Sequence, residues 1–409
     1  MPQAATLTLA DALPQLAAIV DVEHTHLGAD AFSVAPANAE QISAILRFGS
    51  ERGLTVTPTG AGTKLGWGNP VAPHIRLALN RMNALREHSW QDMTCGVEAG
   101  CSWAAMQAQL ARHGQMVALD PLWPVRATVG GIVATNDGGP LRIRYGGLRD
   151  LIIGMTVVLA DGTIAKTGGK VVKNVAGYDL HKLMTGSFGT LGVITEVNFR
   201  LHPLEVQART WSAEVADPLL FEAPLRTLLD SHIIPSGLQL RVDAQQCAID
   251  IRVSATPACL DDHAGQLTKF FAEIPVHESN ESVWQARQNL FDQPGVVILK
   301  VSVLPSQICS TLSQLQAWSV AEGAEFAAVA QCNGLVNIAL KAKPDTATAL
   351  IERLRLQCNS VVILQFPAEL HGHIDPWGFD STALPLMREI KRRFDPERIL
   401  NPGRFVGNI

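Results

Sequence analysis

The chain has 409 residues, of which 47% are hydrophobic and 17% are charged, and its formal net charge is −5. This length and composition predict a globular protein of two or three domains, and the negative charge argues against nucleic acid or an anionic membrane surface as the main partner. The longest apolar stretch, residues 151–160, is too short to cross a bilayer, so we expect no transmembrane segment.

Cysteine usage and the first residues indicate the compartment. The seven cysteines are scattered without a C-x-x-C pair. This is typical of a reducing compartment and argues against a cysteine-ligated iron–sulfur cluster or zinc ribbon within this chain. The N-terminus has no basic segment followed by an apolar core, so we expect no signal peptide. The expected location is the cytoplasm.

The first elements predict a β-α-β start. Residues 8–20 have the pattern of a short helix. A clearer helix is predicted over 38–53, where Asn38 is the N-cap, Gln41 stands at the capping-box position and Gly53 ends the helix. The strand-like run at 54–58 follows directly and leads into a glycine-rich loop.

The next segments alternate between strands and helices up to residue 203. Residues 93–100 read as a strand, and 102–114 as a helix with Ser102 as its cap. Residues 150–168 read as two strands around the turn Asp161-Gly162, which is a hairpin signal. Another strand is predicted within 189–203.

Glycine density falls after residue 203, and the pattern changes. The segment 204–365 mixes strand-like and helical runs, which predicts a separate α+β domain with an antiparallel sheet. Its strand-like runs are 238–253, 295–305, 334–342 and 360–366, and its helical runs are 282–291 and 346–357. The tail from residue 384 reads as a basic helix followed by turns.

The loop TPTGAGTKLGWGNP at 57–70 has the composition of a phosphate cradle. It is not a Rossmann fingerprint, because Gly66 comes one position late and the breakers Gly68 and Pro70 prevent a helix from starting there. It is not a Walker A loop either, because Lys64 is neither preceded by glycine nor followed by Ser or Thr. An anion-binding nest of backbone amides and an ordinary glycine-rich connection both remain open at this point.

Three further glycine-rich stretches lie at 128–139, 168–179 and 185–196. Glycine at such density usually marks close approach of the backbone to a bulky group. A single stretch is explained by turns alone, but four of them in the first two hundred residues predict an extended ligand lying across this domain.

These stretches also form an ordered set of motifs. P-T-G-A-G-T-K-L-G starts at Pro58, D-P and then T-V-G-G-I-V-A-T-N-D-G-G lie within 120–139, and G-S-F-G-T-L-G-V-I-T-E covers 186–196. With Y-G-G-L-R-D at 145–150 and F-D-P-E-R-I-L-N-P-G-R-F at 394–405, the set resembles the FAD-binding half of the PCMH-type, or vanillyl-alcohol-oxidase-type, flavoproteins. Within that family it is most similar to the FAD-binding E subunits of bacterial glycolate oxidases.

The resemblance covers about residues 35–203 and 384–406 and is weak over 204–365. It implies an α+β fold with a two-part PCMH-type FAD-binding domain at 1–203, a second α+β substrate or cap domain at 204–365, and a C-terminal segment, 366–409, that returns to the flavin. It also implies FAD as the cofactor. Some relatives bond the flavin covalently to a histidine of the pyrophosphate loop; this loop has no histidine, so we expect non-covalent FAD.

By resemblance, the amides of the loop bind the FAD pyrophosphate without a helix behind them, and the other stretches line the rest of the dinucleotide. The expected cofactor-binding residues are Pro58, Thr59, Gly60, Ala61, Gly62, Thr63, Lys64, Asp120, Pro121, Thr128, Gly130, Gly131, Ala134, Thr135, Asn136, Gly138, Gly139, Gly189, Thr190, Leu191, Gly192, Val193, Ile194, Thr195 and Asn401.

Oxidation of a 2-hydroxy acid requires a cation for the carboxylate and a base for the hydroxyl proton. Candidate cations are Arg142, Arg144 and Arg404, for which salt bridges or phosphate contacts are equally consistent roles. Candidate bases are His371 and His373, in the region where catalytic relatives carry G-H-x-G-D-G-N-x-H. The Gly-Asp-Gly-Asn core is missing here, which puts independent substrate oxidation in doubt. A His-x-His pair without further ligands does not predict a metal site.

The resemblance therefore predicts the FAD-binding subunit of a glycolate oxidase-like 2-hydroxy-acid dehydrogenase that oxidises glycolate or D-lactate. Its expected partners are a second flavoprotein subunit and an iron–sulfur subunit that takes the electrons, and peripheral attachment to the inner membrane through these partners is an alternative to a purely cytoplasmic location. Two other functions remain open: a non-catalytic FAD-binding assembly subunit, and a free-standing FAD-dependent oxidoreductase for another hydroxylated substrate.

Overall fold

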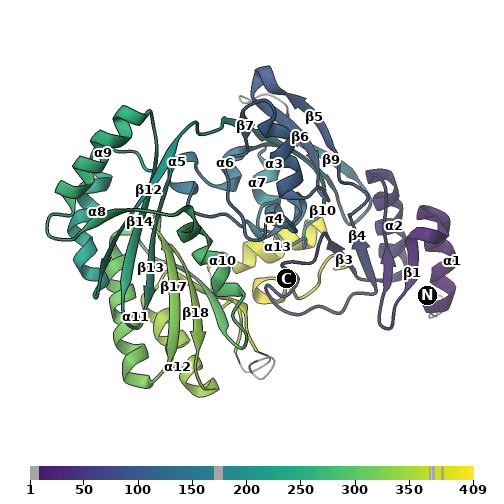
Figure 1. The fold of residues 1–409 in the computed structure, drawn as a ribbon. Helices are drawn as coiled ribbons and strands as arrows, with labels where there is room; N and C mark the ends of the chain where they lie inside the picture. Colours follow the sequence, from purple (N-terminus) through teal and green to yellow (C-terminus); the bar gives the residue numbers. More distant parts are fainter. Residues whose placement is uncertain (1–8, 170–177, 368–369, 371–373, 379–381) are drawn as a thin grey trace.

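The computed structural model describes residues 9–169, 178–367, 370, 374–378 and 382–409. The chain forms two α+β parts side by side, with the C-terminal helix between them (Figure 1). The first part contains a four-stranded and a five-stranded sheet, and the second contains one eight-stranded sheet. The α+β class and the antiparallel sheet of the second part are as predicted.

Helices α1 (Leu9–Val20) and α2 (Ala39–Arg52) open the chain. Asn38 Oδ1 accepts a hydrogen bond from the Gln41 amide at 2.8 Å, and Gln41 Oε1 accepts one from the Ala37 amide at 2.7 Å. Gly53 ends α2 in the left-handed conformation, with φ of 65°. Both predicted helices are confirmed, including the residues that cap the second.

The four-stranded sheet has the order β1-β2-β4-β3, with parallel pairing of β4 to both β2 and β3. Strand β3 runs straight into the glycine-rich loop, so this sheet sets where the loop begins. The strands are β1 (Thr25–Leu27), β2 (Phe32–Val34), β3 (Val56–Thr59) and β4 (Ile75–Ala78).

The five-stranded sheet is antiparallel, in the order β5-β6-β10-β8-β9. The hairpin around Asp161-Gly162 is confirmed, because Val158 pairs with Ile164 and Asp161 Oδ1 accepts a hydrogen bond from the Thr163 amide at 2.8 Å. The strands are β5 (Leu85–Ser89), β6 (Thr94–Glu98), β8 (Ile152–Val158), β9 (Ile164–Gly168) and β10 (Val193–Arg200).

Five helices and a small ribbon complete the first part. Helix α3 begins after Ser102 as predicted, although Ser102 Oγ donates to the Val125 carbonyl at 3.0 Å instead of capping the helix. The elements are α3 (Trp103–Ala111), α4 (Val129–Thr135), α5 (Arg142–Tyr145), α6 (Leu148–Leu151), α7 (Leu180–Met184) and the paired strands β7 (Gln115–Met116) and β11 (His202–Pro203).

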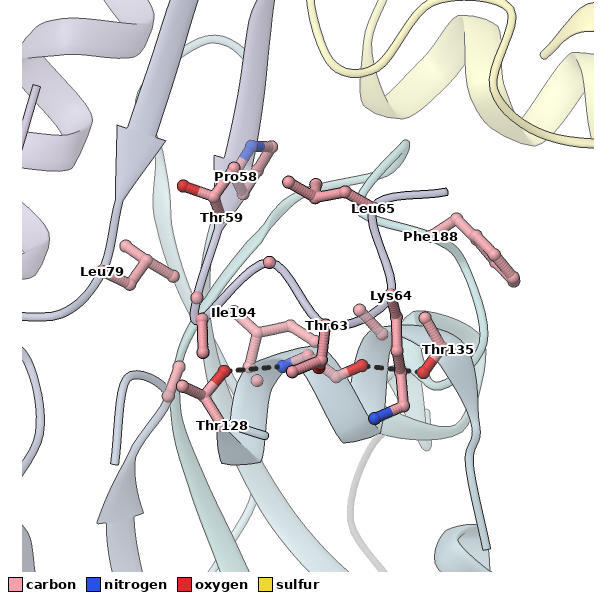
Figure 2. A pocket seen from close by; sticks show the side chains of 18 of the residues that line it. Pro58, Thr59, Thr63, Lys64, Leu65, Leu79, Thr128, Thr135, Phe188 and Ile194 are labelled. Atoms are coloured by element: carbon pink, nitrogen blue, oxygen red, sulfur yellow. Dashed lines mark hydrogen bonds between the residues drawn. The ribbon is translucent and has the colours of Figure 1, made fainter. Parts of the chain in front are cut away.

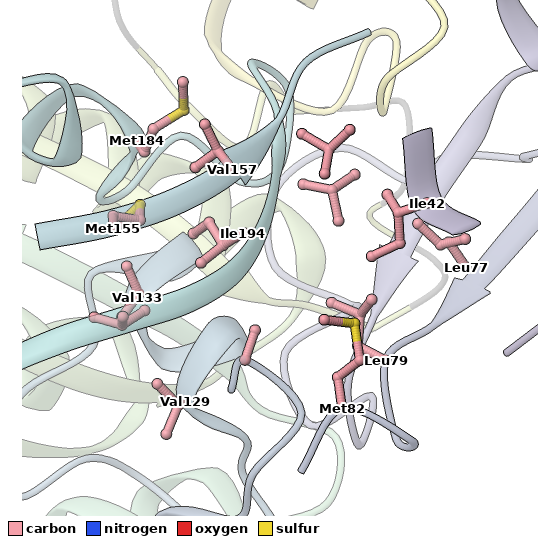
Figure 3. Close-up of a cluster of buried hydrophobic side chains, with 14 of the residues drawn as sticks. Ile42, Leu77, Leu79, Met82, Val129, Val133, Met155, Val157, Met184 and Ile194 are labelled. Carbon is pink, nitrogen blue, oxygen red and sulfur yellow. The ribbon is translucent and has the colours of Figure 1, made fainter. Parts of the chain in front are cut away.

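One apolar core holds the two sheets of the first part together. Figure 3 shows side chains of α2, β4, α4, β8 and β10 meeting in it, among them Ile42, Leu77, Val133 and Val157. Each of these four is at most 2% exposed, so almost all of their apolar surface is removed from water. One side of helix α4 is therefore packed against this core, and its other side faces the glycine-rich loop.

The eight-stranded sheet of the second part is antiparallel throughout, in the order β15-β12-β14-β13-β17-β18-β16-β19. Its strands are β12 (Ala208–Val215), β13 (Gly237–Asp243), β14 (Cys247–Ser254), β15 (Val276–Ser279), β16 (Val297–Ser302), β17 (Glu325–Gln331), β18 (Leu335–Lys341) and β19 (Ser360–Gln365).

Helices cover the two faces of this sheet unequally. Four helices lie on its outer face, while α10 lies on the face toward the first part (Figure 1). The helices are α8 (Glu222–Leu229), α9 (Pro257–Phe270), α10 (Ala286–Phe291), α11 (Ile308–Glu322) and α12 (Pro344–Gln357). Short 3₁₀ turns occur at Val22–His24, Trp90–Asp92, Pro218–Phe221, Glu281–Gln285, Pro305–Gln307 and Val406–Asn408.

The two parts meet in a mostly apolar cluster that includes Trp67, Phe188, Phe291 and Trp377. Helix α13 (Leu384–Phe394) then brings the chain back to the first part. Its buried Lys391 pairs with Asp395 and donates to the Thr190 and Leu400 carbonyls at 2.7 and 2.8 Å. Within the described residues, no helix combines the length and apolar character needed to cross a membrane.

Candidate functional site

A cavity lies between the glycine-rich loop, helix α4 and the turn before β10. It encloses about 660 Å³ of space, including the part open to solvent. Figure 2 shows the loop after Thr59 arching over α4 above this space. The lining residues are Pro58, Thr59, Gly60, Ala61, Gly62, Thr63, Lys64, Leu65, Leu79, Ala99, Thr128, Gly130, Gly131, Ala134, Thr135, Phe188, Gly189, Gly192, Ile194 and Arg404.

Glycine is required at two positions because the backbone segments approach each other closely. A Cβ atom on Gly60 would overlap Oγ1 of Thr128 and lie 3.0 Å from the Thr128 Cβ. A Cβ atom on Gly130 would lie 2.8 Å from the Ala99 Cβ and 3.0 Å from the Ala99 carbonyl oxygen. The walls of the cavity at these points are therefore backbone rather than side chain, and the Gly130 amide donates to the Ala99 carbonyl at 2.7 Å.

Helix α4 lies directly beneath the loop. Thr128 Oγ1 accepts a hydrogen bond from the Gly131 amide at 3.4 Å, and Thr135 Oγ1 donates to the Gly131 carbonyl at 2.8 Å (Figure 2). As expected, no helix begins directly after the loop, because the next element along the chain is β4; α4 comes from a separate segment. The cap at Thr128 and the apolar residues Val129, Ile132 and Val133, which are buried in the core, stabilise a short helix despite its two glycines.

Arg404 fixes the loop from the C-terminal segment. Its Nη2 donates to the Lys64 carbonyl at 3.0 Å, and its Nε donates to the Trp67 carbonyl at 3.4 Å. Burial lowers the pKa of Arg404 to about 10, so the guanidinium remains charged at neutral pH. Arg404 lines this first cavity rather than standing apart as a substrate-binding cation.

Asn401 holds the same region together from behind. Its Oδ1 accepts a hydrogen bond from Thr57 Oγ1 at 2.6 Å, and its Nδ2 donates to the Phe188 carbonyl at 2.8 Å. Asn401 is fully buried and does not line the cavity. It bonds to the start of the loop and to the turn before β10, which are 344 and 213 positions away from it in the sequence.

A second, polar cavity lies where the first part meets the sheet of the second. Its walls come from the segment after α4, from α5 and α10, and from strands β16, β17 and β18. The lining residues are Leu119, Asn136, Asp137, Gly138, Arg142, Gly147, Leu148, Arg287, Lys300, Gln331, Leu335 and Asn337. Three of these residues are cations, so the cavity carries an excess of positive charge.

Asp137 is the centre of a buried ion network that joins the two cavities. Its Oδ1 accepts from Arg287 Nη2 at 2.5 Å, and its Oδ2 lies 3.3 Å from Lys64 Nζ. Its Oδ2 also accepts from the Leu122 amide at 2.8 Å. Burial by itself raises the pKa of Asp137, but Arg287 and Lys64 outweigh burial, so its pKa lies below its ordinary value. Asp137 therefore stays ionised at neutral pH.

The strands of the sheet position the remaining polar side chains of this cavity. Asn337 on β18 pairs with Lys300 on β16, and Asn337 Oδ1 accepts a hydrogen bond from Arg287 Nε at 3.0 Å. Gln331 on β17 donates to the Gly138 carbonyl at 3.3 Å, while its Oε1 is buried without a hydrogen-bond partner among the described residues. An unsatisfied buried acceptor is costly unless a ligand or water donates to it.

The candidate catalytic residues fall in different places. Arg142 lines the second cavity, whereas Arg144 points away from it, lies over the ring of Tyr145 at 5.6 Å and donates to the Ile234 carbonyl at 3.5 Å. His371 and His373 lie outside the described residues, so their roles stay predictions. Sequence reasoning did not identify Arg287, Lys300 or Asn337, because they lie on elements of the second part that carry no readable motif.

Asp120 lies close behind the second cavity, and Gly139 packs against it so tightly that a Cβ atom there would lie 2.6 Å from its carboxyl group. Its Oδ2 accepts from the Leu141 amide at 3.3 Å, and its Oδ1 is buried with no partner among the residues described. Burial raises the pKa of Asp120 to about 7, against smaller lowering effects of the Leu141 amide and Arg287.

This raised pKa predicts a pH effect on stability. The folded state retains a proton on Asp120 that the unfolded state releases above about pH 4. The contribution of Asp120 to stability is therefore complete below about pH 4 and is lost as the pH rises through about 7. We expect Asp120→Asn, which is uncharged and nearly isosteric, to show a smaller fall in the free energy of unfolding than the wild type between about pH 5 and 8. Urea titrations at both pH values measure this, and an unchanged fall would contradict it.

Two family models match the chain in the same order as these structural parts. An FAD-binding domain matches residues 31–168, and the C-terminal domain of FAD-linked oxidases matches residues 376–405. The chain therefore carries an FAD-binding domain. The first match contains the glycine-rich loop and α4, and the second contains α13 and Arg404, so the first cavity has walls from both matched segments.

Similar proteins include several oxidoreductases. Glycolate oxidase subunit GlcD of Bacillus subtilis is 35% identical over 207 residues, 50% of this chain and 44% of GlcD. D-lactate dehydrogenase of Archaeoglobus fulgidus is 33% identical over 230 residues, 56% of this chain and 46% of that protein. The chain thus spans less than half the length of these two relatives. An uncharacterized FAD-linked oxidoreductase of Mycobacterium tuberculosis, Rv2280, is 26% identical over 92% of this chain and 91% of its own length.

Solved structures show that the fold extends beyond the FAD-binding domain. The 4-ethylphenol oxidase from Gulosibacter chungangensis superposes with a TM-score of 0.74 over 97% of this chain and 96% of its own, at 14% identity. At this identity the likeness concerns the fold alone. It includes the eight-stranded sheet, where the sequence resemblance was weak.

The structure divides the residues expected in the FAD-binding domain into two groups. Fifteen of them line the first cavity: Pro58 to Lys64, Thr128, Gly130, Gly131, Ala134, Thr135, Gly189, Gly192 and Ile194 are all among its walls.

 

Seven of these residues lie at the end of β3 and in the loop, five in or just before α4, and three at or just before the start of β10.

The other expected residues do not line the first cavity. Val193 and Thr195 alternate with Ile194 along β10 and so point to the opposite face of the sheet, a distinction that strand periodicity already implied. Asn136 and Gly138 line the second cavity instead. The residues outside the first cavity are Asp120, Pro121, Asn136, Gly138, Gly139, Thr190, Leu191, Val193, Thr195 and Asn401. The lining residues that were not expected there are Leu65, Leu79, Ala99, Phe188 and Arg404.

Proposed function

We propose that the chain is the FAD-binding subunit of a 2-hydroxy-acid dehydrogenase that oxidises glycolate or D-lactate. The observation that carries the proposal is the polar cavity with Arg142, Arg287 and Lys300 in its walls, beside the segment 134–139 that continues from the first cavity. A compact cavity rich in cations suits a small substrate with a carboxylate.

The first cavity fits the FAD dinucleotide. Gly60 and Gly130 leave no room for side chains, so backbone groups of the loop and of α4 form its walls. We propose that the amides of residues 59–64 hold the pyrophosphate, with Arg404 fixing the loop around it, and that Thr128, Gly130 and Gly131 line the dinucleotide. The loop contains no histidine, which supports non-covalent binding. When bound, FAD supplies the acceptor for the hydride that leaves the substrate.

Several polar side chains of the second cavity take part in the proposed binding of substrate. We propose that Arg142 and Arg287 bind the substrate carboxylate. Arg287 is held in place by Asp137 and by Asn337, so its guanidinium is oriented before substrate arrives. The unsatisfied Oε1 of Gln331 accepts a hydrogen bond from a donor on the ligand.

A complex is part of the proposal. The name of the GlcD relative describes a subunit of glycolate oxidase, and the resemblance of this chain to the E subunits of such oxidases implies a second flavoprotein subunit and an iron–sulfur subunit. We propose that the electrons pass to the iron–sulfur subunit, and that the complex is cytoplasmic or attached to the inner membrane through its partners.

A second function is favoured by the segment 367–378. It lacks the Gly-Asp-Gly-Asn core that catalytic relatives carry in this region. An FAD-binding subunit that serves assembly without oxidising substrate accounts for this loss equally well.

Anaerobic mixing of the flavin-loaded protein with glycolate or D-lactate tests the proposal. We expect loss of the visible flavin absorbance with the chain alone, whereas bleaching that requires the partner subunits supports the assembly role or a shared site. If no 2-hydroxy acid bleaches the flavin, with or without the partner subunits, the proposed dehydrogenase activity is contradicted.

The two arginines of α5 provide a matched pair of variants. Arg142→Met removes a cation from the second cavity, and Arg144→Met removes one from the surface beside Tyr145. A hydrogen bond to a charged group contributes about 1.5–3 kcal/mol, so we expect Arg142→Met to raise the KM for the hydroxy acid about 10- to 100-fold. Steady-state kinetics should show no such rise for Arg144→Met. Equal effects of the two variants would contradict the assignment of this cavity.

A further inference from the structure

Lys300 occupies an unusual position in the second cavity. It lies on β16 between Asn337 of β18 and Val362 of β19, and it shares the sheet face of Ile298, toward the first part. Its side chain lines the cavity. No hydrogen bond or ion pair joins the Lys300 amine to another residue of the described chain, so this amine is available to a ligand.

The charged groups around Lys300 come from three other elements. Arg142 approaches from α5, Arg287 from α10, and Asp137 from the segment after α4. Asp137 makes no direct ion pair with Lys300, because its two oxygens are bonded to Arg287, Lys64 and the Leu122 amide. Burial lowers the pKa of Lys300 to about 8; the charge of Asp137 partly opposes this shift, and the charges of Arg287 and Arg142 add to it. About a tenth of the amine is therefore neutral at pH 7.

The other polar groups of the cavity are poor proton acceptors. Arginine stays protonated in proteins, and the amide oxygens of Gln331 and Asn337 accept hydrogen bonds without taking up a proton at neutral pH. The pKa of Asp137 lies below its ordinary value, so it does not retain a proton there. Asp120 titrates near neutral pH but is not a wall of the cavity. Among the described residues of the cavity, the Lys300 amine is the group suited to accept a proton near neutral pH.

We propose that Lys300 is the catalytic base that accepts the hydroxyl proton of the substrate while Arg142 and Arg287 hold its carboxylate. The inference rests on the proposed function. In the step, the O–H bond breaks and its proton goes to the lone pair of Lys300 Nζ, which becomes an ammonium. The C–H electron pair would leave as hydride, for which bound FAD would supply the acceptor, and the oxygen electron pair would form the carbonyl of the 2-oxo acid.

Two variants of Lys300 separate this role from carboxylate binding. Lys300→Arg keeps the charge but cannot act as a base near neutral pH, and Lys300→Met removes both. We expect both variants to lower kcat by about 10²- to 10⁴-fold. The dissociation constant of 2-hydroxyisobutyrate, a 2-hydroxy acid with no α-hydrogen, should change less than about threefold in the two variants, since the arginines still hold its carboxylate. Weaker binding of this analogue to Lys300→Met by tenfold or more, with kcat unchanged, would make Lys300 a carboxylate ligand and overturn the proposal.

A readout that does not depend on turnover tests the amine itself. The flavin-loaded protein is acetylated with acetic anhydride at a series of pH values, and the modification of each lysine is followed by mass spectrometry. We expect Lys300 to become reactive about two pH units below the range ordinary for a lysine amine, because its pKa is lowered to about 8. The exposed Lys341 of β18, whose amine pairs with Glu325 at 3.0 Å, shows in the same samples that the reagent is active. Modification of Lys300 only within the ordinary range, or none at any pH, would overturn the proposal. If no hydroxy acid bleaches the flavin but Lys300 still reacts early, the dehydrogenase fails while the neutral amine stands.

Discussion

Gly60→Val is expected to leave the protein without flavin. The first atom of the new side chain would overlap Oγ1 of Thr128, and the side chain would project into the cavity lined by the loop and α4. Overpacking of this kind costs about 1–3 kcal/mol, and each 1.4 kcal/mol is a factor of about ten in affinity. Flavin retention should therefore fall by about tenfold or more, measured as visible absorbance per chain after purification and after reconstitution with FAD.

Gly66→Ala is the matched control in the same loop. A Cβ atom on Gly66 meets nothing within 4 Å, and Gly66 is not a wall of the first cavity. This variant should keep its full flavin content. Far-ultraviolet circular dichroism of both variants separates loss of the cofactor from loss of the fold. Full flavin content in a folded Gly60→Val protein would show that this loop does not bind FAD.

Gly62 is a weaker test of the same site. The residue has φ of 74°, so valine there strains the backbone, but its Cβ would lie 3.4 Å from Leu65, an ordinary contact. The structure therefore makes Gly60 the position at which a side chain most directly obstructs the cavity.

Asp137→Ala is expected to be the most destabilising substitution in the second cavity. It leaves Arg287 and Lys64 buried without a carboxylate and removes the acceptor of the Leu122 amide. Removing one partner of a buried ion pair typically costs about 3–5 kcal/mol. The free energy of unfolding should fall by about this amount in urea titrations, with unfolding followed by both tryptophan fluorescence and circular dichroism.

The exposed pair Glu325–Lys341 provides the control for this substitution. Both side chains are more than half exposed, at 76% and 57%, so Glu325→Ala should change the free energy of unfolding by less than about 1 kcal/mol. A comparable loss in both variants would mean that the Asp137 network does not stabilise the junction of the two parts.

Several helix ends and turns of the first part could be predicted because residues close together in the sequence specify them. Asn38, Gln41 and Gly53 specify the ends of α2 through contacts within a few residues, and the turn at Asp161 does the same for its hairpin. Helix α4 was not foreseen, because Gly130 and Gly131 disfavour a helix and only packing of its apolar side against the core makes one form.

The residues of the candidate site likewise differ in whether the sequence predicted them. The glycine spacing and motif order identified the loop, the segment 128–139 and the turn before β10, and most of these residues do line one cavity. Which side of each strand faces that cavity was less evident, as Val193 and Thr195 show. Arg287, Lys300 and Asn337 could not be assigned, since no motif in the second part distinguishes them from ordinary polar residues of a helix and a sheet.

The sequence by itself determined the FAD-binding framework, because close backbone approach demands glycine at fixed positions and leaves a pattern in the chain. Only the tertiary structure decided which residues from distant parts of the sequence contact or face that framework. Asp137 and Arg287 are 150 positions apart, and Thr57 and Asn401 are 344 apart. Contacts over such separations depend on how the sheets and helices pack as whole units, and no local periodicity or spacing records them.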